Sequence, residues 1–95
     1  MKALKTDKAP AAIGPYSQAI EVNGFVFASG QIPLNPATGE FVEGGIKEQT
    51  RQALNNAREI LRSAGLDLSN VVKTSVMLAD IKYFGEMNEV YAEFF

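Results

Sequence analysis

The Asn23-Gly24 pair is the feature that most constrains how this 95-residue chain can fold. It separates two runs of β-favouring residues, 17–22 and 25–30. A type I′ turn needs a positive φ at both central residues, which Asn and Gly adopt at low cost. The pair therefore predicts a two-stranded antiparallel hairpin.

The two-residue turn also sets which residues of the hairpin lie opposite each other. One face is apolar near the turn and holds two opposed pairs: Val22 with Phe25, and Ile20 with Phe27. The same face is polar at the open end, where we expect Gln18 opposite Ser29 and Tyr16 opposite Gln31. The other face carries small residues: Ser17, Ala19, Ala28 and Gly30. Small side chains permit close approach of another backbone, either within the chain or from a second subunit.

The remaining patterns predict an α+β fold. Residues 1–15 read as an irregular arm, residues 40–42 as a short third strand, and residues 71–79 as a β-branched strand. Apolar residues at helical spacing predict a helix over 46–64, which Gly65 and Leu66 end in a Schellman motif. Asp80 is expected to cap a second helix with an apolar stripe of Phe84, Met87, Tyr91 and Phe94. The order β-β-β-α-β-α predicts a sheet with helices on one face.

Composition excludes several functions. Nine basic and 11 acidic residues give a net charge of -2, which argues against a nucleic-acid or anionic-membrane partner. The chain has no His and no Cys, so histidine acid–base catalysis, thiolate chemistry and zinc–sulfur sites are excluded. No apolar run approaches the roughly 20 residues of a membrane span. We therefore expect one cytoplasmic domain over residues 1–95, with no membrane association and no metal site.

Two helix faces carry clustered charges, and each can be interpreted either as ordinary solvent-exposed surface or as a binding site. Glu86, Glu89 and Glu93 share one face, for which solvation is favoured over metal binding. Arg51, Arg58 and Arg62 share a face of the first helix, where pairing with Glu48 and Glu59 is favoured over anion binding.

The chain ends at Phe94-Phe95, inside an apolar helical stripe and without a C-cap signal. Either the last helical turn docks on the sheet, or the chain lacks its C-terminal portion. We favour the second interpretation.

The open end of the hairpin is the candidate site. Its hydroxyls, amides and backbone N–H groups come from residues 16–18 and 29–31, beside two proline breaks at 15 and 33. Such groups suit a small polar ligand, because carboxylates bind backbone N–H and hydroxyl donors. The same polar residues would also be expected without a binding site, if these strand ends were polar only because they are exposed to water.

Several motifs, in order and at matching spacing, resemble the RidA (YjgF-type) family of enamine/imine deaminases. They lie at residues 9–19, 28–33, 73–76, 80 and 87–95. The resemblance implies a chorismate-mutase-like or ferredoxin-like α+β protomer that forms a homotrimer with ligand clefts between subunits. It implies a hydrolase that converts reactive 2-imino acids, such as 2-iminobutanoate or 2-iminopropanoate, to 2-oxo acids and ammonia without a cofactor or metal.

By position, the resemblance implies substrate-binding roles for Tyr16, Ser29 and Gly30, with Gln31 beside them and Asn88 near the cleft. In the family, the arginine that clamps the substrate carboxylate and the glutamate that positions water lie beyond the position of Phe95. No catalytic residue can therefore be named in this chain, and we expect weak or absent activity from the 95 residues alone. The alternatives are a non-catalytic small-carboxylate binder, a chaperone-like interaction module, an RNA-cleaving enzyme, and an incomplete fragment that aggregates through its open sheet edge.

Overall fold

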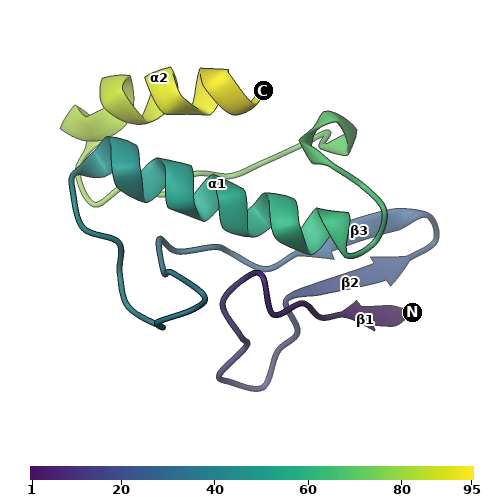
Figure 1. Ribbon diagram of the computed structural model, residues 1–95. Coiled ribbons are helices and arrows are strands. Elements are labelled where there is room, and N and C mark those ends of the chain that lie inside the picture. The colour runs from purple at the N-terminus through teal and green to yellow at the C-terminus, as the bar shows by residue number, and fades with distance from the viewer.

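The computed structural model describes all residues from Met1 to Phe95. It contains three strands, two α-helices and two short 3-10 turns: β1 (Lys2–Leu4), β2 (Ala19–Val22), β3 (Phe25–Ala28), α1 (Ile46–Arg62), η1 (Leu68–Asn70), η2 (Ile81–Tyr83) and α2 (Phe84–Phe94). The strands form one antiparallel sheet in the order β1-β2-β3. Both helices lie on the same side of this sheet (Figure 1), which confirms the predicted α+β class.

The hairpin has the predicted turn and register. Asn23 and Gly24 both have positive φ, 51° and 80°, as a type I′ turn requires. Val22 lies opposite Phe25, and the pairing continues to Ala19 opposite Ala28. Both strands are two residues shorter at the open end than predicted. One further bond, from Ser29 N–H to the Gln18 carbonyl at 3.0 Å, prolongs the ladder before it frays.

The prediction of an irregular N-terminal arm was wrong for residues 2–4, which form strand β1. This strand pairs with β2, with Leu4 opposite Ala19. Local sequence gives little sign of it, because three residues carry no clear period. The strand forms because Leu4 is buried in the core and because β2 offers a free edge.

On the face of the hairpin with small residues, Ala19 is buried, whereas Ala28 and Gly30 are exposed. Ala19 joins Leu4, Ala9 and Ile60 in the core, with Val26 and Ala64 packed against this cluster. Ile60 comes from α1, so the small side chain of Ala19 lets the sheet approach the helix closely. The sequence left open whether this face contacts the same chain or a second subunit, and the structure shows the contact within the chain.

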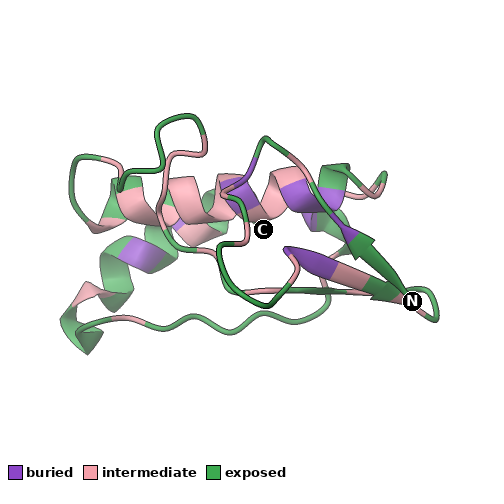
Figure 2. Ribbon diagram, turned by 90° about the horizontal axis from the view of Figure 1, so that it is seen from below, coloured by how far each residue is buried: buried purple, intermediate pink, exposed green.

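The opposite face of the hairpin is open to solvent. The side chains of Phe25 and Phe27 are 61% and 64% exposed, with their ring centroids 6.4 Å apart. Figure 2 shows buried residues where α1 meets the sheet and also on α2. The chain therefore has one thin core under its helices and an uncovered apolar sheet face.

The predicted strands at 40–42 and 71–79 are absent. Phe41 makes a single isolated bridge with Leu34, and the Val42 N–H donates to the Pro33 carbonyl at 3.0 Å. These contacts close a loop and build no strand. Residues 72–78 cross the molecule without any backbone hydrogen bond. A high β propensity cannot make a strand where no neighbouring strand is in reach.

Helix α1 begins at Ile46 as predicted and ends at Arg62, two residues before the predicted end at residue 64. It follows Gly45, whose N–H donates to Glu48 Oε2 at 2.9 Å. At its other end, Gly65 has a φ of 76°, the Leu66 N–H donates to the Leu61 carbonyl at 2.9 Å, and the Gly65 N–H donates to the Arg62 carbonyl at 3.0 Å. These two bonds are those of a Schellman motif, which confirms the prediction of this motif.

Helix α2 packs along α1. Asp80 caps the preceding turn η2 rather than α2 itself, accepting from the Lys82 N–H at 2.9 Å. Met87 and Val90 are buried, whereas Phe84 is half exposed, so the predicted stripe was wrong at Phe84 and missed Val90. No helix is long and apolar enough to cross a membrane.

Candidate functional site

The open end of the hairpin brings the serines of both strands together. The Ser29 hydroxyl donates to the Ser17 carbonyl at 2.7 Å, one residue beyond the last pair of the ladder. This bond fixes the Ser29 side chain and uses its hydrogen. Toward a ligand, the Ser29 oxygen can then act as an acceptor.

Free backbone donors follow directly after Ser29. Gln31 Nε2 donates to the carbonyls of Ser29 and Gly30, at 3.1 and 3.3 Å. The N–H groups of Gly30 and Gln31 donate to no group of the protein. No atom lies within 4 Å of the position that a Cβ on Gly30 would occupy. Two neutral donors therefore border open space, which suits an anionic oxygen.

Tyr16 reaches the same end of the hairpin from the preceding turn. Its N–H donates to the Gly14 carbonyl at 2.8 Å across Pro15, and its ring lies against Gly14, where an added Cβ would be 3.3 Å from the ring. The side chain is 53% exposed, and its hydroxyl has no partner in the protein. Gly14-Pro15 thus holds the ring by one edge and leaves the phenol hydroxyl free.

Tyr16 and Ser17 also line a cleft of about 450 Å³ between the hairpin and the N-terminal arm. Its other walls include Lys5, Asp7 and Pro36. Ser29, Gly30 and Gln31 do not line this cleft. Tyr16 therefore lines the cleft, whereas the free donors of residues 30 and 31 lie outside it, and the predicted pair of Tyr16 with Gln31 is not part of the ladder.

Asn88 does not join these residues within one chain. It is exposed on α2, and α1 separates that helix from the hairpin (Figure 1). The structure thus brings Tyr16, Ser29, Gly30 and Gln31 to one end of the hairpin and leaves Asn88 on another face.

Two buried amides hold the loops around the candidate site. Gln18 is buried: its Oε1 accepts from the Thr6 N–H at 2.7 Å, and its Nε2 lies 2.8 Å from the Pro10 carbonyl and 3.1 Å from that of Thr6. These bonds tie the N-terminal arm to β2 directly beside Tyr16. Sequence reasoning placed Gln18 at the polar end of the hairpin and missed that its amide points into the protein.

The second buried amide, Asn56, was not singled out from the sequence. Its Nδ2 donates to the carbonyls of Ile32 and Leu34, at 3.2 and 2.9 Å, and its Oδ1 accepts from Gln52. It thereby fixes the segment after Gln31 against α1. A polar residue between Ala53 and Ile60 on the apolar side of a predicted helix was the signal that could have identified it.

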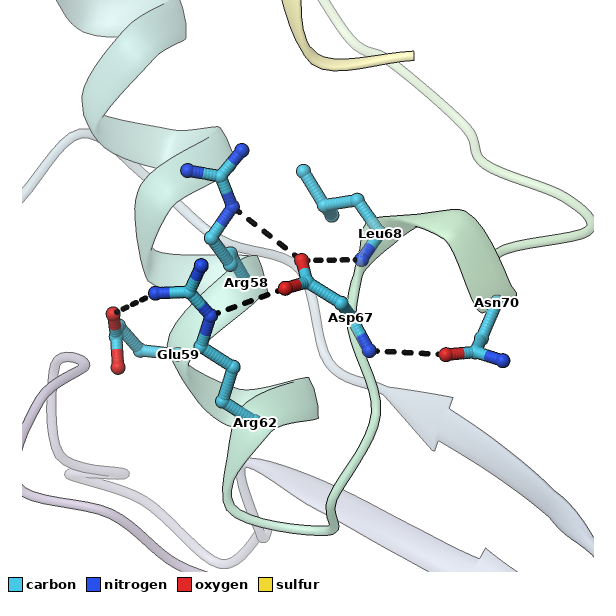
Figure 3. A network of polar contacts seen from close by, with 6 residues as sticks. All are labelled: Arg58, Glu59, Arg62, Asp67, Leu68 and Asn70. Atoms are coloured by element: carbon cyan, nitrogen blue, oxygen red, sulfur yellow. Dashed lines mark hydrogen bonds and ion pairs between the residues drawn. The ribbon is translucent and has the colours of Figure 1, made fainter.

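The arginines of α1 are occupied by acidic groups. Arg62 Nε donates to Asp67 Oδ2 at 3.2 Å and Arg62 Nη1 to Glu59 Oε1 at 3.4 Å (Figure 3). Arg58 Nε lies 3.5 Å from Asp67 Oδ1, and its guanidinium stacks on the Phe94 ring at 4.9 Å. Surface pairing is therefore found for this face, including the predicted pair Glu59–Arg62.

The remaining charges link the two helices. Arg51 pairs with Glu93 at 2.5 Å rather than with Glu48, as the sequence had suggested, and Lys47 pairs with Glu89 at 2.6 Å. The hydrogen bond from Lys47 to Glu89 is the main cause that raises the pKa of Lys47 above its ordinary value. Glu89 and Glu93 thus form solvent-exposed ion pairs, in agreement with the prediction that this face of the helix is solvated.

Asp67 organises the turn after α1. Its Oδ1 accepts from the Leu68 N–H at 2.7 Å, and its own N–H donates to Asn70 Oδ1 at 3.1 Å (Figure 3). The Leu68 N–H, followed by Arg62 and Arg58, holds the pKa of this carboxyl below its ordinary value. This network has a structural role, because it lies on α1 and η1 rather than at the hairpin end.

The candidate site can bind but has no evident proton-transfer group. Residues 14–18 and 29–32 include no carboxylate, Lys or Arg. No group of three or more Asp, Glu, His or Cys residues is placed to hold a metal ion. The site offers a phenol hydroxyl and backbone donors, which orient a small anion rather than activate water.

Comparison with known proteins assigns the chain to a family. The family described as endoribonuclease L-PSP matches residues 6–95. Mouse 2-iminobutanoate/2-iminopropanoate deaminase is 53% identical over 94 residues, which are 99% of this chain and 70% of the mouse protein.

Solved structures show the same fold. RidA from the Antarctic bacterium Psychrobacter sp. PAMC 21119 is 42% identical with a TM-score of 0.95, over 100% of this chain and 76% of that protein. E. coli TdcF with bound serine is 41% identical with a TM-score of 0.95, over 100% of this chain and 74% of TdcF. These matches confirm the family indicated by the sequence motifs: the chain belongs to the endoribonuclease L-PSP family, together with RidA-type proteins.

Proposed function

We propose that this chain is an enamine/imine deaminase that hydrolyses 2-iminobutanoate or 2-iminopropanoate to the 2-oxo acid and ammonia. The single observation that supports this most is the 53% identity with the mouse deaminase over 99% of the chain. In the reaction, water adds to the protonated C=N carbon, and the resulting carbinolamine loses ammonia to leave the C=O group.

The hairpin end suits the substrate's carboxylate. The N–H groups of Gly30 and Gln31 and the Tyr16 hydroxyl are uncommitted donors, and Gly30 leaves open space beside them. We assign Tyr16 to substrate contact, the backbone of Gly30 and Gln31 to carboxylate binding, and the Ser29 oxygen to accepting a hydrogen bond from the imine N–H. Asn88 would complete such a cleft from a neighbouring subunit of a homotrimer, since α1 separates it from the site of its own chain.

The reaction is tested by generating 2-iminobutanoate in situ with threonine dehydratase and following ammonia release, with the mouse deaminase as positive control.

We expect Gly30→Ala to lower any activity at least tenfold, because the added methyl fills the space beside the free donors. Gly85→Ala is the matched control, since a Cβ there also meets nothing within 4 Å but lies on α2. Tyr16→Phe, with Tyr83→Phe as its control, removes the free hydroxyl. A rate equal to that of buffer for the unmodified chain would contradict catalysis.

Binding without turnover is the second candidate, and the absence of any carboxylate, Lys or Arg at the hairpin end favours it. Isothermal titration calorimetry with 2-oxobutanoate separates the two. Binding that Gly30→Ala abolishes, without ammonia release, would assign the chain to small-carboxylate binding. No binding at millimolar ligand would contradict both candidates.

RNA cleavage, which the family's description names, has less support in this chain. The net charge is -2, and the α1 arginines face acidic partners, so these arginines do not form a free basic stripe that could follow a phosphate backbone. We expect no cleavage of single-stranded RNA above a buffer control.

A further inference from the structure

The free N–H groups of Gly30 and Gln31 lie on a two-residue span that is anchored at both ends. Before the span, the N–H and the hydroxyl of Ser29 both donate to carbonyls of the facing part of the hairpin, at 3.0 and 2.7 Å. After the span, the Ile32 carbonyl accepts from Asn56 Nδ2 at 3.2 Å. The first anchor belongs to the hairpin itself, whereas the second belongs to helix α1.

The side chain of Gln31 shows that the two free donors face the same way. Its Nε2 donates to the carbonyls of Ser29 and Gly30, which belong to the same peptide groups as the free N–H groups of Gly30 and Gln31. In a trans peptide the C=O and N–H groups point in opposite directions, and this chain has no cis peptide bond. Both donors therefore point away from the Gln31 side chain and can bind one carboxylate together.

Helix α1 supplies the second anchor because the segment after Gln31 cannot continue a ladder. Pro33 has no N–H, so it cannot donate to a neighbouring strand. Asn56, which is 1% exposed, instead donates from Nδ2 to the carbonyls of Ile32 and Leu34, at 3.2 and 2.9 Å. A carbonyl oxygen only accepts, so the nitrogen end of the amide must face this pair.

Asn56 is itself held by a residue one turn earlier on the helix. Gln52 Nε2 donates to Asn56 Oδ1 at 2.8 Å, which satisfies the oxygen end of the buried amide. One turn later on the same helix, Ile60 is fully buried in the core. The amide thus connects the loop after the free donors to a helix that is fixed by its own packing.

We propose that Asn56, oriented by Gln52, is a positioning residue for carboxylate binding, because it sets where the N–H groups of Gly30 and Gln31 lie. This inference rests on the carboxylate binding proposed above for the hairpin end. Asn56 is buried, so it contacts no ligand and acts only through the backbone of the loop. Binding groups need to be held to within about 0.5 Å of their working positions, which is what an anchor at Ile32 provides.

Gln52→Glu tests the proposal without opening a cavity, because the two side chains are nearly the same size. It puts a carboxylate oxygen in place of the donor that faces Asn56 Oδ1, and the two oxygens repel each other. We expect the affinity for 2-oxobutanoate, measured by isothermal titration calorimetry, to fall on the order of tenfold. The amide resonances of Gly30 and Gln31 in the ligand-free protein should shift as well.

Two controls separate the hydrogen bond from the added charge. Gln49→Glu adds the same charge to α1, one turn before Gln52 and about two turns before Asn56. Gln52→Lys is the rescue variant, because its ammonium again offers a donor to Asn56 Oδ1. We expect its affinity and its resonances to match those of Gln49→Lys, which carries the same positive charge.

Resonances of Gly30 and Gln31 that move no further in Gln52→Glu than in Gln49→Glu would overturn the proposal. Equal affinities of these two variants would overturn it too, as would a Gln52→Lys variant that binds as weakly as Gln52→Glu. If the unmodified chain binds no 2-oxobutanoate, the proposed function fails. The resonances of the ligand-free variants then decide by themselves whether Asn56 positions the two donors.

Discussion

Single side chains in this protein act mainly by holding loops. Gln18 and Asn56 are buried amides whose hydrogen bonds go to the backbone of segments that flank the hairpin end. A loop without regular structure needs partners for its polar groups, and a buried amide supplies both a donor and an acceptor. The position of Tyr16 therefore depends on the Gln18 side chain two residues away.

Replacing Gln18 with Leu should destabilise the fold by about 2–4 kcal/mol, because the Thr6 N–H and the carbonyls of Thr6, Ala9 and Pro10 lose their partner. Urea unfolding followed by circular dichroism measures the loss. Gln31→Leu is the control: it uncovers two carbonyls near the surface and should cost less than about 1 kcal/mol. Equal losses for the two variants would show that the arm is not held by Gln18.

Asp67 should make stability depend on acidity. The Leu68 N–H and then Arg62 hold the pKa of this carboxyl below its ordinary value of 3.8, so the folded state favours the ionised form. Its stabilising contribution is complete above the pKa of the unfolded chain and is lost as the pH falls through the lower pKa of the folded chain. We expect Asp67→Asn to lower Tm most above about pH 4, with a difference from the unmodified protein that shrinks as the pH falls below that value. A Tm difference that stays constant from pH 7 to pH 2 would contradict this linkage.

The elements differ in how far their own residues determine them. The hairpin turn, the start of α1 and the Schellman motif after it arise from contacts within a few residues, and all were predicted from local patterns. Strand β1 and residues 72–78 depend on partners elsewhere, and both predictions were wrong. A helix satisfies its backbone internally, whereas a strand exists only if another strand lies beside it.

Gly65→Ala tests the end of α1. The φ of 76° at Gly65 is unfavourable for a residue with a Cβ, although no atom lies within 4 Å of the Cβ position. We expect a loss of about 1 kcal/mol, seen as a lower urea midpoint. Gly85→Ala lies inside α2 with similar open space and should instead stabilise the protein by up to about 1 kcal/mol. A neutral result at Gly65 would show that the helix ends elsewhere in solution.

At the scale of the whole molecule, the limiting factor is the small core. Ten of 95 residues are buried, so each buried apolar side chain contributes a large share of the stability. Ile60 carries the contact between α1 and the sheet and is fully buried.

Ile60→Ala should therefore cost about 2–5 kcal/mol, enough to unfold much of the chain at 37 °C. Thermal unfolding by circular dichroism measures the change. Ile13→Ala is the control, because its side chain is exposed and should leave Tm unchanged. If Ile60→Ala melts like the unmodified protein, the sheet and α1 do not share one core.

By itself, the sequence determined the hairpin register, the start of α1 and the Schellman motif after it, the α+β class and, through its motifs, the family. The register, the features of α1 and the fold class depend on residues close together in the sequence, and the family assignment depends on motifs that relatives share. Only the tertiary structure decided that Ala19 faces a helix, that the amides of Gln18 and Asn56 point inward, that Asn88 lies away from the hairpin end, and that residues 72–78 have no sheet to join. The reason is physical: strand pairing and burial are contacts between segments that are far apart in the sequence. A local sequence pattern does not specify which distant segment will lie beside it.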